Sequence, residues 1–447
     1  MRPRGSRNTT RTALFIAYHY PPIRSAGIER TVGFLRHLRG HGYRARVLTT
    51  SAFGSPAPDV DDPALEVVRA WEPVGLYRRL RRPGQGSGLF PPSYERTDPG
   101  RLRGLLGLAR RFLLIPDGQV TWVPAALVQA ARLLRRTPVE LLYSSHPPAS
   151  GHLLALLLKW ATGLPWVADF RDGWTSDPLD PGLEHGGWRL ALEQALERAV
   201  VRRADAVVAA TEISAAHLRQ LCGPETDKVK VIPNGFDPEA LGPPAPLPPL
   251  SPPLRLVHTG AFRYSHPRRT PFPLLAALDL LLAEDPAWAG RLQVVLVGQL
   301  TPEEEAATAG LVQAGLVELV GPQPREEALR LQAAAHLLLL VDHVRPWPAS
   351  NVPGKLYEYL AAGRPVLALC GPGMVQRLLS ELDAGRCVAG DDPVAIAAAL
   401  RDLYRAFVEG RMPSPARPEQ LLRFHRSRLA GELAACFDQV LAKKGTR

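Results

Sequence analysis

Residues 13–49 read ALFIAYHYPPIRSAGIERTVGFLRHLRGHGYRARVLT and contain the pattern from which the fold class is predicted. The short apolar run at 13–17 is typical of a parallel strand that is covered on both faces. A loop follows, then a helical pattern over 30–38, with glycines just beyond it that can end the helix. A second strand is predicted at 45–49. The stretch is therefore a strand–loop–helix–strand unit, the building block of a doubly wound sheet.

The same alternation continues along the chain, apart from residues 53–120, which are rich in Pro, Gly and Arg and are predicted to be irregular. Further strands are predicted at 141–144, 166–170, 206–209, 229–232, 254–258, 292–297, 316–320, 337–341 and 366–369. Predicted helices include 124–136, 151–160, 188–203, 273–283, 353–362 and a last helix at about 418–442.

A proline-rich segment divides the alternation into two halves. Residues 237–253, DPEALGPPAPLPPLSPP, contain eight prolines and suit an extended linker, with a long surface loop as the alternative. The prediction is an α/β protein with two Rossmann-like, doubly wound domains that face each other across a cleft. The predicted domains are 1–236 and 254–410, and the C-terminal helix region 411–447 is expected to pack back toward the first domain.

The composition is that of an ordinary globular protein, with 46% hydrophobic and 22% charged residues, so a wholly disordered or collagen-like chain is excluded. The four cysteines stand far apart without metal-ligand spacing, which argues against a disulfide scaffold and a cysteine-bound zinc site. No apolar run approaches the ~20 residues of a membrane span. We therefore expect a cytoplasmic protein.

The charge of +11, from 54 basic and 43 acidic residues, favours anionic partners such as phosphates or an acidic membrane. Residues 101–114, RLRGLLGLARRFLL, could lie on the inner face of the cell membrane as a peripheral contact, or form a basic helix packed on its domain. Arg residues with few neighbouring aromatics give no nucleic-acid-binding module.

The segment NVPGKLYEYL at 351–360 carries the most chemical information in the second half. Pro353 and Gly354 begin a helix whose first N–H groups and dipole favour an anion, and Lys355 adds a full positive charge. Glu358 shares a helix face with Lys355. A cation beside a carboxylate suits a sugar nucleotide, whose diphosphate lies next to a ribose. The alternative is a surface Lys–Glu pair.

Basic side chains follow the strand predicted at 254–258, where open α/β sheets bind ligands. The loop HTGAFRYSHPRRTPF holds Arg263, Arg268 and Arg269, and arginine binds phosphate oxygens two at a time. These arginines are candidates to neutralise a leaving pyrophosphate, or they form a solvated basic loop. Gly298, which ends the next predicted strand, is a further donor-side candidate.

The first half carries candidates for an acceptor. Asp169, Arg171 and Asp172 in DFRDGW follow a strand and are expected to project into the cleft, where an Asp could orient or deprotonate an acceptor hydroxyl. The alternative is an Asp–Arg pair within the loop. His146 ends another strand and could equally be structural. Gly27 lies in a loop of small residues that lets backbone approach a ligand, although the loop is not a GxGxxG fingerprint.

Other motifs are weaker. The D-x-D at residues 59–61 lies in a proline-rich loop, so no metal is predicted to bind there. Glycines at 84, 86 and 88 alternate, but no helix follows them as a phosphate-binding loop requires. We predict no metal site and no cofactor other than a nucleotide diphosphate sugar as co-substrate.

Taken in order, these motifs resemble glycosyltransferase family 4, which has the GT-B fold, over residues 12–405. YHYPPIRSAGIER, LPWVADFRDGW, RRADAVVAATEIS with KVKVIPNGFD, HTGAFRY with RRTPF, and VPGKLYEYLAAGRPVLAL each resemble a segment of the family. IPDGQVTW at 115–122 is similar to a subset that acts in bacterial surface-polysaccharide assembly.

The resemblance implies a retaining, metal-independent transfer of sugar from a nucleotide diphosphate to a glycan or lipid-linked acceptor. Lys355 and Arg269 would hold the diphosphate, and Glu358 would bind the ribose hydroxyls. Asp172 falls at the family's acceptor-side polar position, and Gly27 would let its loop approach the donor.

One position departs from the family. Many members carry two Glu eight residues apart, and Glu358 matches the second, but Ser350 stands where the first would be. Ser350, Asn351 and nearby backbone would then hold the sugar, or activity is impaired. A non-catalytic GT-B scaffold that binds sugar nucleotides or a partner transferase is therefore the alternative function, and a GT-B sugar-nucleotide epimerase is a third.

Overall fold

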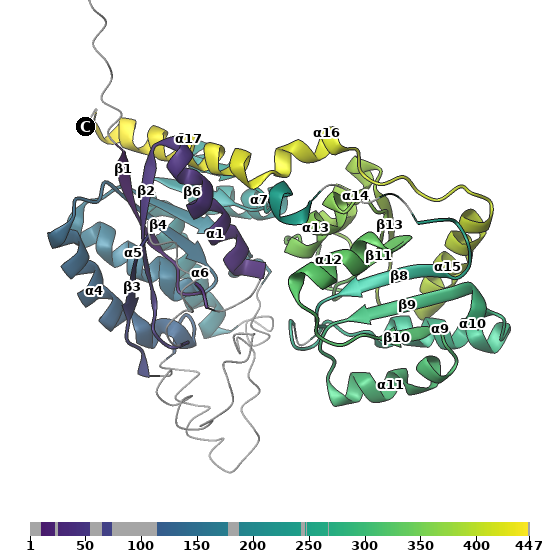
Figure 1. Cartoon of the computed structure of the whole chain (residues 1–447). Helices are drawn as coiled ribbons and strands as arrows, with labels where there is room; N and C mark the ends of the chain where they lie inside the picture. Colours follow the sequence, from purple (N-terminus) through teal and green to yellow (C-terminus); the bar gives the residue numbers. More distant parts are fainter. Residues whose placement is uncertain are drawn as a thin grey trace, which may run out of the picture. The chain divides into compact units, whose positions relative to one another are not determined.

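The computed structural model describes residues 10–22, 26–53, 65–73, 114–177, 187–242, 246, 248–266 and 268–445. These residues form two compact units (Figure 1). The first holds the described residues up to Asn234 together with α17 (Arg426–Gly445), and the second holds Gly235–His425. The C-terminal region thus divides at His425, so that residues 411–425 belong to the second unit.

The first unit contains a seven-stranded sheet with the order β3-β2-β1-β4-β5-β6-β7, and all its strand pairs are parallel. Its strands are β1 (Arg11–Ile16), β2 (Tyr43–Thr50), β3 (Glu66–Ala70), β4 (Leu141–His146), β5 (Trp166–Phe170), β6 (Ala206–Ala209) and β7 (Val229–Val231). The central strand β1 pairs Ala13 with Ala45 on one side and with Leu141 on the other.

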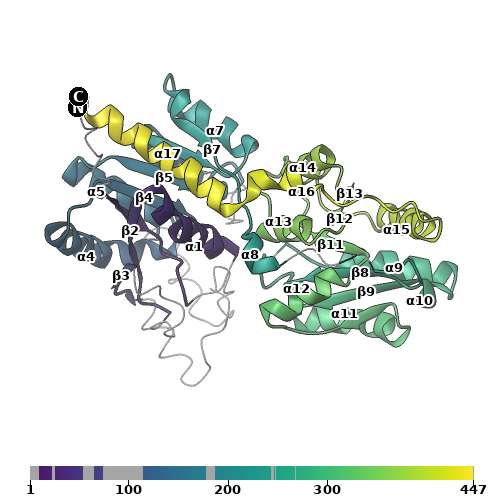
Figure 2. The ribbon, with the colours of Figure 1, turned by 45° about the horizontal axis from the view of Figure 1, so that its top comes forward.

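Helices cover both faces of this sheet, which is why its strands are nearly continuous apolar runs. On β1, Leu14 and Ile16 contribute to one core and Ala13 and Phe15 to the other. The first core is covered by α4 (Val123–Arg136), α5 (Ala149–Thr162), α6 (Trp188–Arg203) and α7 (Glu212–Cys222), and the second by α1 (Ala26–Leu38) and α17. Figures 1 and 2 show α17 lying along α1. Short 3-10 turns are η1 (Arg39–His41), η2 (Gly118–Trp122) and η4 (Thr226–Lys228).

The second unit contains a six-stranded parallel sheet with the order β10-β9-β8-β11-β12-β13. Its strands are β8 (Leu254–Thr259), β9 (Leu292–Val297), β10 (Val317–Leu319), β11 (Leu337–Val341), β12 (Val366–Leu369) and β13 (Gly385–Val388). One face is covered by α9 (Phe272–Glu284), α10 (Trp288–Arg291), α11 (Pro302–Gln313) and α15 (Pro393–Val408), and the other by α12 (Arg325–Ala333), α13 (Gly354–Ala361), α14 (Met374–Leu382) and α16 (Pro418–Leu421).

The two doubly wound sheets confirm the predicted fold class, but α7, α11, α14 and α15 were not predicted, and the structure differs from the sequence prediction in three further places. Residues 66–70, predicted to be irregular, form β3 at the edge of the first sheet. β13 was not predicted, because GRCV is short and only partly buried. The last predicted helix is broken: α16 and η5 (Leu422–Phe424) precede His425, and α17 begins after it, where the chain returns to the first unit.

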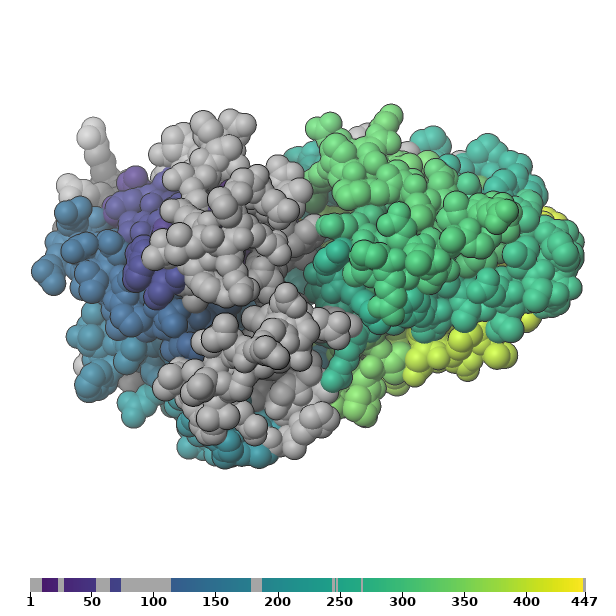
Figure 3. Space-filling model, turned by 90° about the horizontal axis from the view of Figure 1, so that it is seen from below, coloured from purple at the N-terminus to yellow at the C-terminus, as the bar shows by residue number. Residues whose placement is uncertain are grey.

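The described part of the predicted linker is bound to the second unit. After α8 (Pro238–Leu241), the carbonyl of Pro246 accepts from Arg364 (2.8 Å), and His336 Nε2 donates to the carbonyl of Pro249 (3.0 Å). The two units therefore divide at residue 234, ahead of the prolines. Figure 3 shows the teal and green surface of the second unit bordered by yellow segments from near the end of the sequence.

The predicted membrane-facing segment 101–114, the D-x-D at 59–61 and the alternating glycines at 84–88 lie outside the described residues, apart from Leu114. In the part of the chain that the structure does describe, no helix combines the length and the apolar character needed to cross a bilayer.

Candidate functional site

Lys355 lies in the first turn of α13, and its side chain reaches the end of β8. Nζ donates to the carbonyl oxygen of Thr259 at 2.8 Å. Burial, and then the nearby Arg269 guanidinium, lower the pKa of Lys355 from 10.5 to about 7. Burial and Arg269 thus disfavour the charged form of this partly buried amine, and a bound anion would favour it.

Two glycines make room for this lysine. Gly260, at φ +100°, follows β8, and a Cβ there would lie 2.9 Å from Lys355 Nζ. Gly298, at φ +153°, follows β9, and a Cβ there would lie 2.6 Å from the carbonyl oxygen of Gly260. Both positions therefore require glycine. Gly298, a predicted donor-side residue, contacts the backbone of Gly260 and not the lysine itself. Its missing side chain lets the ends of β8 and β9 approach each other.

Arg269 lies beside Lys355, as predicted, but it is already paired. Its guanidinium binds the buried carboxylate of Asp342 (2.8 Å), which follows β11, and donates to Ser265 Oγ (2.9 Å). Arg269 is only 9% exposed, and its Nε–H is buried without an acceptor among the described residues. A buried donor without an acceptor is costly, so this atom marks where a ligand oxygen would be stabilised.

Asp342 is the carboxylate on which this cluster is built. Arg345 donates to its second oxygen at 3.3 Å, and His343 lies 3.4 Å from the first. Burial alone would raise the pKa of Asp342, but the Arg269 guanidinium, followed by His343 and Arg345, holds the pKa well below its ordinary value. Asp342 is therefore an anion, and one carboxylate faces two guanidinium groups.

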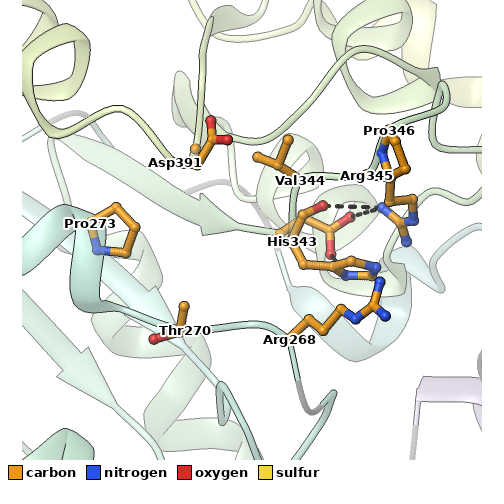
Figure 4. A pocket seen from close by; sticks show the side chains of 10 residues that line it. Arg268, Thr270, Pro273, His343, Val344, Arg345, Pro346 and Asp391 are labelled. Atoms are coloured by element: carbon orange, nitrogen blue, oxygen red, sulfur yellow. Dashed lines mark hydrogen bonds and ion pairs between the residues drawn. The ribbon is translucent and has the colours of Figure 1, made fainter. Parts of the chain in front are cut away.

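A pocket of about 460 Å³ opens beside this cluster at the carboxyl ends of the strands of the second unit (Figure 4). Arg268, His343 and Arg345 lie on one side, and Thr270, Pro273 and Asp391 lie on the other. The imidazole of His343 stacks on that of His266, with centroids 3.9 Å apart. Burial, then His343 and Arg269, lower the pKa of His266 to about 3, so that ring stays neutral.

The remaining predicted donor-side residues occupy different surroundings. Glu358 binds Arg325 of α12 at 2.8 Å, and Asn351 accepts from Arg345 at 3.0 Å, which ties its loop to Asp342. Ser350 is buried in that loop at 3% exposure. Arg263 pairs instead with Glu303 of α11 and covers the ring of Phe272, so the structure does not bring it to Lys355.

In the first unit, Asp172 and His146 lie together at the ends of β5 and β4. His146 Nδ1 donates to the carbonyl oxygen of Asp172 (3.2 Å), and the Asp172 carboxylate pairs with Arg171 Nε at 3.2 Å. Burial lowers the pKa of His146 to about 4, so it is a neutral, structural group at physiological pH. The Asp172 side chain keeps 23% exposure. Gly27 lies in the first turn of α1.

The prediction that Asp169 projects from the strand end into a cleft is wrong. It is fully buried in β5, where Arg30 binds both of its oxygens (2.8 and 2.9 Å) and Tyr143 donates to it (2.6 Å). Arg30 also donates to the carbonyls of Ile232 and Pro233. Strand alternation points Asp169 into the sheet–helix interface, so it serves the core of the first unit.

Asp342, His343 and Arg345 are not among the residues predicted from the sequence. They nevertheless follow the pattern that marks the ligand edge, polar side chains directly after a strand, because VDHVRP continues the apolar run of β11. Arg268, Arg269 and Arg345, together with Lys355 when it is protonated, outnumber the carboxylates Asp342 and Asp391 at this edge. The edge thus suits an anionic ligand. Within the described ranges, no group of three or more His, Cys, Asp or Glu residues could hold a metal ion.

Two family models match this chain, one in each half. Residues 26–235 match the family described as a glycosyl transferase 4-like domain, and residues 254–406 match glycosyl transferases group 1. The D-inositol 3-phosphate glycosyltransferase of Geodermatophilus obscurus is 29% identical over 225 residues. That match spans 46% of this chain and 46% of the relative, less than half of either.

Solved structures share the fold. Sucrose-phosphate synthase from Thermosynechococcus elongatus is 15% identical, with 98% of both chains covered and a TM-score of 0.62. A glycosyltransferase from Rickettsia africae is 14% identical, with 97% of this chain and 99% of that one covered and a TM-score of 0.61. The Anabaena protein HepE, in complex with UDP-glucose, is 16% identical, with 98% and 100% covered and a TM-score of 0.55.

Proposed function

The chain belongs to the glycosyltransferases that join a glycosyl transferase 4-like domain to a group 1 domain, and from this premise we propose that it moves a sugar from a nucleotide diphosphate donor to a glycan or lipid-linked acceptor. Bacterial surface-polysaccharide synthesis is the proposed setting. Retention of the anomeric configuration is part of the proposal on the strength of the family resemblance. Proton NMR of the first product formed reports the configuration.

The observation that carries the proposal is the surplus of positive charge at the strand ends of the second unit. Lys355 is partly buried with a lowered pKa, and Arg269 holds a buried Nε–H without an acceptor among the described residues. Both groups are stabilised when a diphosphate supplies oxygens and negative charge. A neutral ligand leaves the surplus uncompensated.

The proposed mechanism follows from where charge develops. As the bond to the anomeric carbon breaks, negative charge grows on the leaving diphosphate, and Lys355 and Arg269 offset it; such electrostatic terms are often the largest in catalysis. Glu358 is proposed to accept from the ribose hydroxyls, releasing Arg325 as it does so. Asp172 is proposed to orient the acceptor hydroxyl or take its proton. The cationic side chains supply the charge that a divalent ion would otherwise give, so we propose no metal requirement.

Incubation with a panel of nucleotide sugars, first among them UDP-glucose, tests the proposal. We expect release of the nucleoside diphosphate and transfer of the sugar, both undiminished by EDTA. Binding of donors without release on any acceptor would favour a non-catalytic scaffold. Interconversion of the sugar without loss of the nucleotide would favour an epimerase.

The Asp172→Asn variant separates acceptor chemistry from donor binding. The amide keeps the size of the side chain but cannot take a proton, so kcat is expected to fall roughly 10²- to 10⁴-fold. The Kd for the nucleoside diphosphate, measured by calorimetry, should stay unchanged. Unchanged kcat in this variant would remove Asp172 from the reaction.

Donor affinity should depend on pH through Lys355. The free protein loses the Lys355 proton as the pH rises through about 7, whereas a bound diphosphate favours the charged amine. Binding above pH 7 therefore requires proton uptake, and the Kd should rise by up to ~10-fold per pH unit between about pH 7.5 and 9. Lys355→Arg keeps its charge and should flatten this slope. An equally steep slope in the arginine variant would assign the titration to another group.

A further inference from the structure

Two carboxylates lie on the buried face of α6, although most of the other charged residues of that helix are exposed. Glu193 and Glu197 are 0% and 1% exposed, and a spacing of four residues places them one above the other on the helix. Glutamate is almost never fully buried unless it is paired. Burial raises the pKa of Glu193 to about 7, which reflects the cost of placing a carboxylate there.

Each carboxylate binds one residue of the loop that follows Asp172, and Glu193 also pairs with Arg189 of α6 at 3.6 Å. Trp174 Nε1 donates to Glu193 at 2.7 Å, and Thr175 Oγ1 donates to Glu197. His217 of α7 also donates to Glu197, at 3.3 Å. One helix therefore holds two consecutive residues of the loop by their side chains.

Trp174 is also connected to Asp172, through His146. The indole of Trp174 stacks on the imidazole of His146, with centroids 5.7 Å apart and planes 21° apart, and His146 Nδ1 donates to the carbonyl of Asp172. The loop turns tightly at Gly173, where a Cβ would lie 2.9 Å from the backbone nitrogen of Asp177. The backbone of Asp172 is thus fixed through His146 on one side and through Trp174 and Thr175 on the other.

We propose that Glu193 and Glu197 are positioning residues, which hold loop 171–177 so that Asp172 stays in place to receive an acceptor hydroxyl. This inference rests on the role proposed above for Asp172. The physical reason is that a reacting group displaced by ~1 Å can cost about 10²-fold in rate. Two apolar residues would pack α6 without the cost of desolvating two carboxylates, but they would leave Trp174 Nε1 and the Thr175 hydroxyl without acceptors.

A double-mutant cycle between Glu197 and Thr175 tests the proposal. Glu197→Ala and Thr175→Val each remove the same hydrogen bond, from its two ends, so each should lower kcat by about 10- to 100-fold while the donor Kd stays unchanged. The double variant should be no slower than the slower single variant, because residues that share one contact are not additive. Glu197→Gln retains an acceptor for Thr175 and should recover most of the activity.

Glu212→Ala is the matched control, since this glutamate of α7 is 62% exposed and pairs with Arg219 at the surface. Its kcat should equal that of the wild type. Additive losses in the double variant, or a loss confined to donor affinity, would overturn the proposal. Thr175→Val keeps the shape of the threonine, so it remains informative if Glu197→Ala does not fold.

Hydrogen exchange provides a readout that needs no activity. In Glu197→Ala and Thr175→Val, the amides of residues 171–177 should exchange faster, while those of β4 and β6 keep their protection. If the panel of donors gives no transfer at all but the loop still loosens, the proposed function fails and the positioning contact stands. If the loop exchanges as in the wild type, the positioning role is refuted.

Discussion

Replacement of Lys355 by alanine is expected to lower kcat/KM for the nucleotide sugar roughly 10²- to 10³-fold, the scale of losing one charged group that stabilises a developing anion. The variant should keep its fold, because the Lys355 amine donates to the Thr259 carbonyl but its charge is penalised by burial. Removal of a partly buried cation with a lowered pKa is neutral or stabilising in the absence of donor. Steady-state kinetics and a thermal melt together measure both effects.

Arg263→Ala is the control for this result. Arg263 was also a candidate phosphate ligand, but it pairs with Glu303 on α11, so its removal should change kcat/KM little. Full activity in Lys355→Ala would contradict the assignment of the donor site. Equal losses in both variants would show that the general basic character of the unit, and not the cluster at β8, attracts the donor.

Replacement of Asp169 by alanine is expected to cost the first unit about 3–5 kcal/mol of unfolding free energy. The change leaves the buried Arg30 guanidinium without its carboxylate and removes the acceptor of the Tyr143 hydroxyl. The melting temperature of this unit should fall by roughly 6–20 °C. Tryptophan fluorescence reports the unfolding of this unit, since six of the eight tryptophans lie in the sequence assigned to it.

The exposed aspartate at 438 supplies the comparison. Asp438 pairs with Arg11 at the surface and accepts from the Tyr43 hydroxyl at 2.7 Å, but its own side chain is 58% exposed, so water can replace these contacts. Asp438→Ala should therefore lower the unfolding free energy by only about 1 kcal/mol. An Asp169→Ala variant that melts like the wild type but has lost transfer would return Asp169 to the acceptor chemistry.

Most of the fold follows from the sequence because strands of a doubly covered parallel sheet are uninterrupted apolar runs. LFI, VVA and LLLL are of this kind, and each lies in a strand. The same reasoning misses β3 and β13, which are edge strands that are only partly buried and carry charged residues. It also misses the break at His425, because both sides of the break are helical.

The candidate site was predicted less completely, for a physical reason. Position after a strand identifies which residues lie at the ligand edge, but it does not identify which charges are already paired. Asp169 and Asp172 are three residues apart in the same loop-and-strand segment, yet one binds Arg30 in the core and the other stays partly exposed. Arg263 and Arg269 lie in one loop, yet Arg263 pairs with the exposed Glu303 and Arg269 with the buried Asp342. Such pairings join distant parts of the chain, so the local pattern does not contain them.

A crystal structure of the chain with a bound nucleoside diphosphate would show whether the donor binds at the proposed cluster. The account predicts that the diphosphate lies at the strand ends of the second unit, with its oxygens within hydrogen-bond distance of Lys355 Nζ and Arg269 Nε. A diphosphate bound elsewhere on the protein, with both of these groups left as they are in the free chain, would contradict it.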